Sequence, residues 1–230
     1  AGWSTEGGVG SHEVEDEVLN IDFTSPHFKA KDRHSWVTRN TNATPLKEFW
    51  KPIKKHCDAR GIIFFSTPMS RKAAQKLQKV GVPFWKVGSG DIFDYVLLDY
   101  LAQTKKPVIY STGMASLQEL DGIVKHLSSR GVPQVILYCI SKYPAPKRYF
   151  NLGTIEYLKE KYPQITVGFS DHSLGHDVAL AAVKLGAKVV EKHFSFSRDL
   201  WGADHKVSMT PAEMKEFVRL VRTGAYKKVP

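Results

Sequence analysis

Six short apolar runs, each ending in polar residues and separated from the next by a helical pattern, constrain the fold of this chain more than any other feature. The runs recur roughly every 25 residues and are continuously apolar, which is typical of parallel strands covered by helices. In order, their ends read FFSTP, KVGSGD, IYSTGM, CISKYP, GFSDH and VEKHF. The pattern predicts an α/β protein with about six βα units.

Helix start signals fall between these runs. Thr44 followed by Pro45 reads as an N-cap with proline at the first helical position, and Ser116 and Glu119 have the spacing of a capping box. Thr210 begins a second capping box. The predicted helices cover residues 45–59, 70–80, 93–103, 117–130, 151–162 and 175–185, with a last helix from Pro211.

Polar residues after every run distinguish two α/β architectures. A (β/α)8 barrel gathers its active site at the carboxyl ends of all its strands. A doubly wound sheet binds its ligand at one switch point. Because polar residues follow every run here, we expect a (β/α)8 barrel of the triosephosphate isomerase (TIM) type. We expect this barrel to be incomplete, with about six units.

The N-terminal segment, residues 1–44, differs from the rest of the chain. It is glycine-rich, then acidic, then polar and irregular, with only VLNIDF as a candidate strand. We expect an irregular N-terminal arm. Residues 45–230 show no linker and are predicted to form the partial barrel domain.

Composition limits the partners and the compartment. The net charge is +10, but lysine and arginine are scattered along the predicted helices without a dense basic tract, which favours an anionic small molecule over nucleic acid. Cys57 and Cys139 make no disulfide framework, which suggests a reducing compartment. Because no apolar stretch reaches about 18 residues, we expect no membrane association and a cytoplasmic location.

Two histidines follow the last two runs. His172 and His193 would meet at the same edge of a parallel sheet, where imidazoles from adjacent strands can reach one metal ion. Glu191 lies two residues before His193 and points the same way from its strand. The alternative is a pair of hydrogen-bonded loop histidines.

Small hydroxyls and a lysine also gather at the run ends. Such groups can hold a phosphate or a carboxylate, although serine and threonine are common wherever strands end. Tyr143 is a candidate for a substrate pocket or for packing, and Asp204 for binding a substrate hydroxyl or for a solvated loop. The candidate anion-binding residues are Thr67, Lys86, Ser89, Ser111 and Ser170.

Several strings resemble the sialic acid synthase family, the synthases of nonulosonic acids that use phosphoenolpyruvate. The resemblance covers roughly residues 45–222, with the strings in the family's order and spacing. They are FFSTP, PFWKVGSGD, KPVIYSTGMAS, CISKYPAP, NLGTIEYLKEKYP, VGFSDHSLGHDVALAAVKLGAKVVEKHF and GADHKVSMTPAEM.

This resemblance implies a (β/α)8 barrel that joins phosphoenolpyruvate to an N-acylated amino sugar such as N-acetylmannosamine, and a homodimer. It implies a divalent ion, usually Mn²⁺ with Mg²⁺ or Co²⁺ as alternatives, held by His172 and His193. Glu191, Asp204 and Tyr143 would be catalytic. The residues implied to bind phosphoenolpyruvate are Thr67, Lys86, Ser89, Ser111 and Ser170, and those implied to bind the sugar are Ser141, Tyr143 and Asp204.

The chain also departs from the family pattern. The strings of the family's first two strands do not occur, so we expect the six runs to match strands three to eight, and the sequence given stops at TGAYKKVP, where the family continues into a C-terminal antifreeze-like domain. Three explanations stay open: a fragment of a longer product, a sheet closed by the arm or by a second chain, or a catalytically impaired barrel that still binds metal and anion. A related 3-deoxy sugar-acid synthase and an interaction protein that assembles through the open barrel edge are further alternatives.

Overall fold

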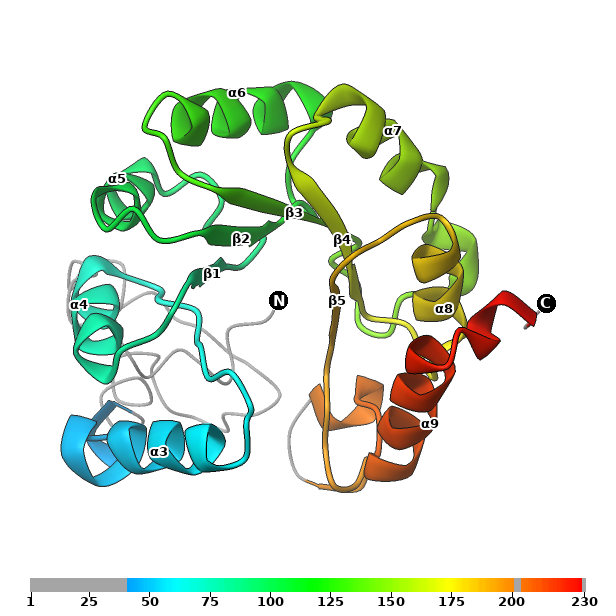
Figure 1. The fold of residues 1–230 in the computed structure, drawn as a ribbon, viewed down its shortest axis with the longest axis horizontal. Helices are drawn as coiled ribbons and strands as arrows, with labels where there is room; N and C mark the ends of the chain where they lie inside the picture. The colour runs from blue at the N-terminus through cyan, green and yellow to red at the C-terminus, as the bar shows by residue number, and fades with distance from the viewer. Residues whose placement is uncertain (1–40, 201–203, 229–230) are drawn as a thin grey trace, which may run out of the picture. The chain divides into compact units, whose positions relative to one another are not determined.

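The computed structural model describes residues 41–200 and 204–228 (Figure 1). The predicted N-terminal arm therefore lies outside the described residues except for its last four positions, and the domain boundary at residue 44 stays a prediction. By its contacts the chain divides into two units. Of the described residues, unit 1 contains Tyr110–Val124 and those from Gln134 onward, and unit 2 contains those up to Ile109 together with Lys125–Pro133.

Helices and strands alternate along the described chain, as the sequence predicts. The strands are β1 (Trp85–Val87), β2 (Val108–Ser111), β3 (Gln134–Cys139), β4 (Thr166–Asp171) and β5 (Val190–Lys192). The α-helices are α3 (Lys51–Ala59), α4 (Arg71–Val80), α5 (Tyr95–Gln103), α6 (Leu117–Ser128), α7 (Gly153–Lys161), α8 (Asp177–Lys184) and α9 (Pro211–Arg222). Shorter helical turns are η2 (Leu46–Trp50), η3 (Lys147–Tyr149), η4 (Asp204–Val207) and η5 (Ala225–Lys228). None of the described helices is both long enough and apolar enough to cross a lipid bilayer.

The strands follow one another in the sheet in the order β1-β2-β3-β4-β5. β3 pairs parallel with β4, and β4 pairs parallel with β5. A doubly wound sheet reverses its strand order at the switch point, whereas a barrel adds each new strand beside the last. The consecutive order therefore supports the barrel-type architecture.

One predicted strand is wrong. The stretch GIIFFSTP forms no strand, so residues 41–200 and 204–228 contain five strands instead of the expected six. Ile62 and Ile63 are 60% and 65% exposed, although their sequence predicts burial. An extended segment becomes a strand only when a neighbour accepts its hydrogen bonds, and within the described ranges no strand pairs with residues 62–68.

The helix start signals have different outcomes. The capping box of α9 is present, with the Thr210 and Glu213 side chains each bonded to the other's backbone N–H. At the start of α6, the Ser116 backbone N–H donates to Glu119 at 2.8 Å, as expected. The predicted cap at Thr44 is wrong, because the first helical turn begins one residue later and has Pro45 at its N-cap.

The core of unit 1 lies between the sheet and its helices. Figure 1 shows α7 and α8 on the same side of β4, and both contact that strand. Phe169 on β4 is fully buried, and its ring packs against Tyr138 and Phe150 with centroids 5.8 and 5.5 Å away. A second cluster joins α8 to α9 through Leu180 and Phe217. These contacts fix the strand ends that carry the candidate site.

Gly168 on β4 leaves no room for a side chain. A Cβ atom there would lie 2.7 Å from Leu137 Cδ2 and 2.9 Å from Val189 Cβ. We therefore expect Gly168→Ala to lower the free energy of unfolding by about 1–3 kcal/mol, measured by urea denaturation. Gly153→Ala at the start of α7, where the nearest atom would be 3.4 Å away, is the control. An equal loss in both variants would contradict the close packing of Gly168.

Candidate active site

At the ends of β4 and β5, side chains project from both faces of the sheet. The parallel register pairs Ser170 with Glu191 and Asp171 with Lys192. Because successive strand residues point to opposite sides, the two pairs lie on opposite faces of the sheet. Ser170 Oγ donates a hydrogen bond to Glu191 Oε1 at 2.6 Å.

The structure brings His172, His193 and Tyr143 together within unit 1. The centroids of the two imidazole rings are 5.3 Å apart. The Tyr143 ring lies against both of them, with its centroid 4.0 Å from that of His172 and 5.6 Å from that of His193. Tyr143 and His193 are half-buried, while His172 is buried. The segments that follow three consecutive strands, β3, β4 and β5, thus supply one aromatic cluster.

The position of the His172 ring determines which nitrogen carries its proton. Its Nδ1 atom lies 2.8 Å from the Ile140 carbonyl oxygen. A carbonyl only accepts, so we assign the proton to Nδ1, which leaves Nε2 with an available lone pair. Burial lowers the pKa of His172 below its ordinary value, although the bond to Ile140 raises it in part. The lowered pKa favours the neutral ring, which is the form that binds metal ions.

The spacing of the two rings fits a shared metal ion. With metal–nitrogen bonds of about 2.1 Å, two imidazoles on one ion have centroids roughly 4.6–5.3 Å apart, for bond angles from octahedral to tetrahedral. The observed separation of 5.3 Å lies at the upper end of this range. Among residues 41–200 and 204–228, no group of three histidine, cysteine, aspartate or glutamate side chains has metal-site geometry. Of the described residues, His172 and His193 are the two whose imidazoles would hold such an ion.

Two residues beside this cluster were not identified from the sequence. Cys139 is buried, with its Sγ 3.9 Å from His172 Nδ1. A Cβ atom on Gly113 would lie 3.0 Å from Cys139 Sγ and 3.1 Å from the Ser141 backbone nitrogen. Gly113 therefore allows the loop after β2 to approach the end of β3. The only sequence signal was a glycine and a cysteine placed at strand ends.

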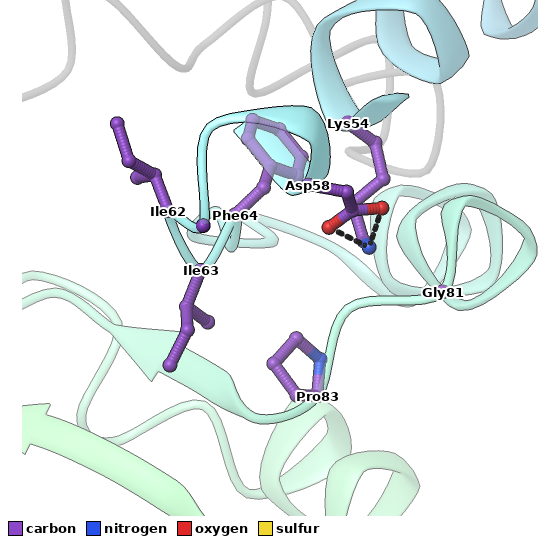
Figure 2. A pocket seen from close by; sticks show the side chains of 8 residues that line it. Lys54, Asp58, Ile62, Ile63, Phe64, Gly81 and Pro83 are labelled. Carbon is purple, nitrogen blue, oxygen red and sulfur yellow. Dashed lines mark hydrogen bonds and ion pairs between the residues drawn. The ribbon is translucent and has the colours of Figure 1, made fainter. Parts of the chain in front are cut away.

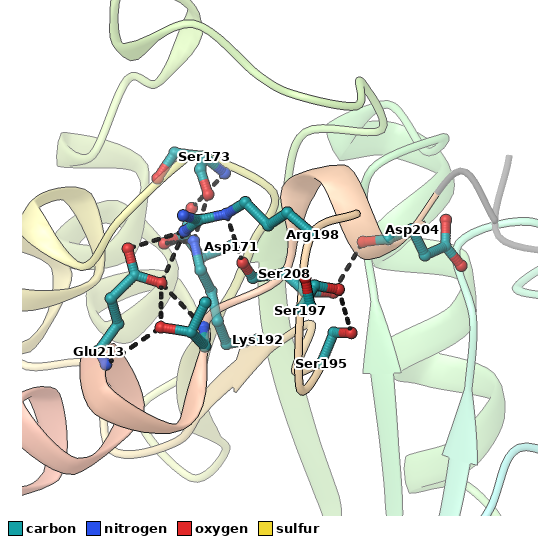
Figure 3. Close-up of polar contacts among 10 residues, drawn as sticks. Asp171, Ser173, Lys192, Ser195, Ser197, Arg198, Asp204, Ser208 and Glu213 are labelled. Atoms are coloured by element: carbon teal, nitrogen blue, oxygen red, sulfur yellow. Dashed lines mark hydrogen bonds and ion pairs between the residues drawn. The ribbon is translucent and has the colours of Figure 1, made fainter. Parts of the chain in front are cut away.

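A buried ion pair was also missed. Lys192 Nζ lies 2.8 Å from Asp171 Oδ2, and their side chains are 2% and 0% exposed (Figure 3). Asp171 lies in FSDH and Lys192 lies in EKHF, two strings whose histidines were the predicted metal ligands. Opposite charges at matching positions of two adjacent strands were the available signal.

The candidate anion-binding residues are divided between the two units. Ser111 and Ser170 are buried in unit 1. Thr67, Lys86 and Ser89 belong to unit 2, where Lys86 is buried and its Nζ donates to the Val87 carbonyl at 2.9 Å. Their joint role as an anion cradle stays a prediction.

The remaining sugar-site candidates lie in unit 1. Ser141 is exposed and follows β3, and the half-buried Asp204 begins η4. The Asp204 main-chain carbonyl accepts a hydrogen bond from Ser208 Oγ at 2.7 Å (Figure 3). Nearby, Ser195 Oγ lies 2.7 Å from His205 Nδ1. These bonds tie η4 to the segments on either side of it.

Glu213 makes the stability of unit 1 depend on pH under acidic conditions. Arg198 donates to both of its carboxylate oxygens, at 2.7 and 2.6 Å, and this guanidinium lowers the pKa of Glu213 to about 2. A depressed carboxyl pKa contributes stability above the ordinary value of 4.5, and that contribution is lost as the pH falls toward about 2. We expect the melting temperature of Glu213→Gln to fall less steeply than that of the wild type over this interval. Parallel curves would contradict the assignment.

Unit 2 contains a separate pocket of about 360 Å³ (Figure 2). The pocket lies between α3 and the exposed segment at residues 61–64, which forms no strand. Lys54 Nζ donates to Asp58 Oδ1 at 2.6 Å, and both residues line the pocket. None of the predicted site residues lines it. The lining residues are Lys54, Asp58, Gly61, Ile62, Ile63, Phe64, Gly81 and Pro83.

Several relatives of the chain are named as synthases of sialic and related acids. An uncharacterised protein of Methanocaldococcus jannaschii is 42% identical over 80% of this chain and 56% of its own. The N,N'-diacetyllegionaminic acid synthase of Campylobacter jejuni is 36% identical over 75% of this chain and 52% of its own. The chain thus spans about half the length of these curated relatives.

A solved structure agrees with the fold. The sialic acid synthetase of Leptospira borgpetersenii superposes with a TM-score of 0.77 at 33% identity, over 85% of this chain and 67% of that one. This similarity and the strand order confirm the predicted α/β fold of an incomplete (β/α)8 barrel. The model of the NeuB family matches residues 13–227, and the chain therefore belongs to the NeuB family.

Proposed function

We propose that the protein containing this chain condenses phosphoenolpyruvate with an N-acylated amino sugar, N-acetylmannosamine or a relative, to form a sialic or other nonulosonic acid. The relatives named as synthases of such acids support this reaction class. The observation that carries the proposal is the cluster of His172, His193 and Tyr143 beside Glu191 at the ends of two parallel strands.

His172 and His193 would hold the divalent ion, with Mn²⁺ preferred. When bound, such an ion supplies a Lewis acid that polarises the aldehyde oxygen of the sugar. The Ile140 carbonyl orients the His172 ring, and Tyr143 packs against both rings. These contacts hold the imidazoles in place before a substrate arrives.

The side chains around the histidines would bind the substrates. Glu191 is oriented by the Ser170 hydroxyl and would accept a hydrogen bond from a sugar hydroxyl or from water. Ser141, Tyr143 and Asp204 would contact the sugar. Phosphoenolpyruvate carries three negative charges that fixed donors and a cation can neutralise. The residues proposed for it are Thr67, Lys86, Ser89, Ser111 and Ser170.

The test follows phosphate release from phosphoenolpyruvate and N-acetylmannosamine, with and without Mn²⁺, and identifies the product by mass spectrometry. We expect release only when both substrates and the ion are present. Turnover with a phosphorylated aldose instead would assign the protein to the 3-deoxy sugar-acid synthases. Metal binding without turnover of either sugar would reject the synthase function and leave a binding protein.

A homodimer and a cytoplasmic location stay predictions. Light scattering of the purified protein tests the first.

A further inference from the structure

The ammonium group of Lys192 bonds to both neighbours of His172 in the chain. It forms the ion pair with Asp171 Oδ2 at 2.8 Å and also donates to the Ser173 carbonyl oxygen (Figure 3). The Ser173 backbone N–H in turn donates to Asp171 Oδ1 at 2.7 Å. The residues before and after His172 are therefore held by one buried cation.

Lys192 is itself the residue before His193. The ion pair thus connects the backbone around one histidine to the strand end that carries the other. Asp171 and Lys192 are also register partners, so the bond lies directly across the β4–β5 pair. Ser170 and Glu191 make the matching hydrogen bond on the opposite face, at 2.6 Å. Both faces of the two strands are therefore joined within two residues of the histidines.

Stability alone does not account for a charged pair at this position. Removing two charges from water is costly, and well-packed apolar residues often replace such a pair without loss of stability. A carboxylate and an ammonium group hold a fixed geometry through several directional hydrogen bonds. Two apolar side chains make no such directional bonds. A directional pair at this position therefore fits a role in precise placement.

We propose that Asp171 and Lys192 are positioning residues that set the distance and orientation of His172 relative to His193. The inference rests on the proposed function, because it assumes that the two rings share a metal ion. The pair lies on the face opposite Ser170 and Glu191 and acts through the backbone on either side of His172.

The experiment compares metal binding by the wild type and by the double variant Asp171→Asn/Lys192→Met. Asparagine keeps the oxygen that accepts from Ser173, and methionine fills the volume of the lysine stem without leaving an unpaired charge. We expect Mn²⁺ affinity, measured by electron paramagnetic resonance of the free ion, to fall about tenfold or more, as for other groups that orient metal ligands. The visible spectrum of bound Co²⁺, which reports ligand geometry, should change as well.

Tyr110→Phe is the matched control. It removes a buried hydrogen bond of 2.8 Å to Gln134 in the same unit, away from the histidines, and should leave Mn²⁺ affinity and the Co²⁺ spectrum unchanged. Asp171→Asn alone is a second test variant, and we expect it to weaken Mn²⁺ binding in the same direction.

The outcomes separate the two proposals. No Mn²⁺ binding by the wild type would reject the metal site itself. Binding by the wild type with unchanged affinity and spectrum in a folded Asp171→Asn or double variant would overturn the positioning role. An equal loss in Tyr110→Phe would also overturn it, because the effect would then follow from general destabilisation.

Discussion

Replacing His172 or His193 by glutamine is expected to abolish measurable Mn²⁺ binding and to lower phosphate release by about a thousandfold or more. The magnitude follows from losing several kcal/mol of charge stabilisation at the reacting oxygen, since each 1.36 kcal/mol is about tenfold in rate. Glutamine keeps a donor that can reach the Ile140 carbonyl from position 172, so the local fold should survive. Calorimetry measures the metal binding, and a colorimetric phosphate assay measures turnover.

His126 offers the matched control. Its Nε2 lies 2.9 Å from Asp99 Oδ1, and its ring packs against Tyr95, so it is a partnered, half-buried histidine in unit 2. His126→Gln should change neither metal binding nor phosphate release. Wild-type turnover in His172→Gln would show that this imidazole does not take part in the reaction.

The sequence predicted the features that depend on local patterns. Continuous apolar runs identified five real strands, and the capping boxes at Ser116 and Thr210 correctly marked the starts of two helices. The meeting of His172 and His193 was also predictable, because parallel strands place their carboxyl ends at one edge of the sheet. Their centroid separation of 5.3 Å confirms that expectation.

Features that depend on pairing and packing were not predictable in the same way. The stretch at residues 62–68 has the composition of a buried strand, but a strand also needs a hydrogen-bonding neighbour. The contact between Gly113 and Cys139 depends on how closely two loops approach, which no residue pattern records. Asp171 and Lys192 were overlooked because charged residues at strand ends usually face solvent. Only the register of β4 and β5 shows that they are partners.

Lys192→Met alone should be among the most destabilising single substitutions in unit 1. It leaves the Asp171 carboxylate fully buried without its cation, and breaking one side of a buried pair typically costs about 3–5 kcal/mol. Burial already lowers the pKa of Lys192, while Asp171 opposes that shift, so the lysine depends on its partner to remain charged. Urea denaturation followed by circular dichroism measures the loss.

Lys161→Met is the control for removing a lysine from an ion pair. Lys161 Nζ lies 2.8 Å from Asp121 Oδ2, but these side chains are 27% and 49% exposed, and such pairs contribute about 1 kcal/mol or less. A loss in Lys192→Met no larger than in Lys161→Met would contradict a fully buried pair. The double variant Asp171→Asn/Lys192→Met should recover most of the stability, because no unpaired charge remains, while its metal affinity stays low. Recovered folding with lost affinity would separate the energetic effect of the charges from their effect on the placement of the histidines.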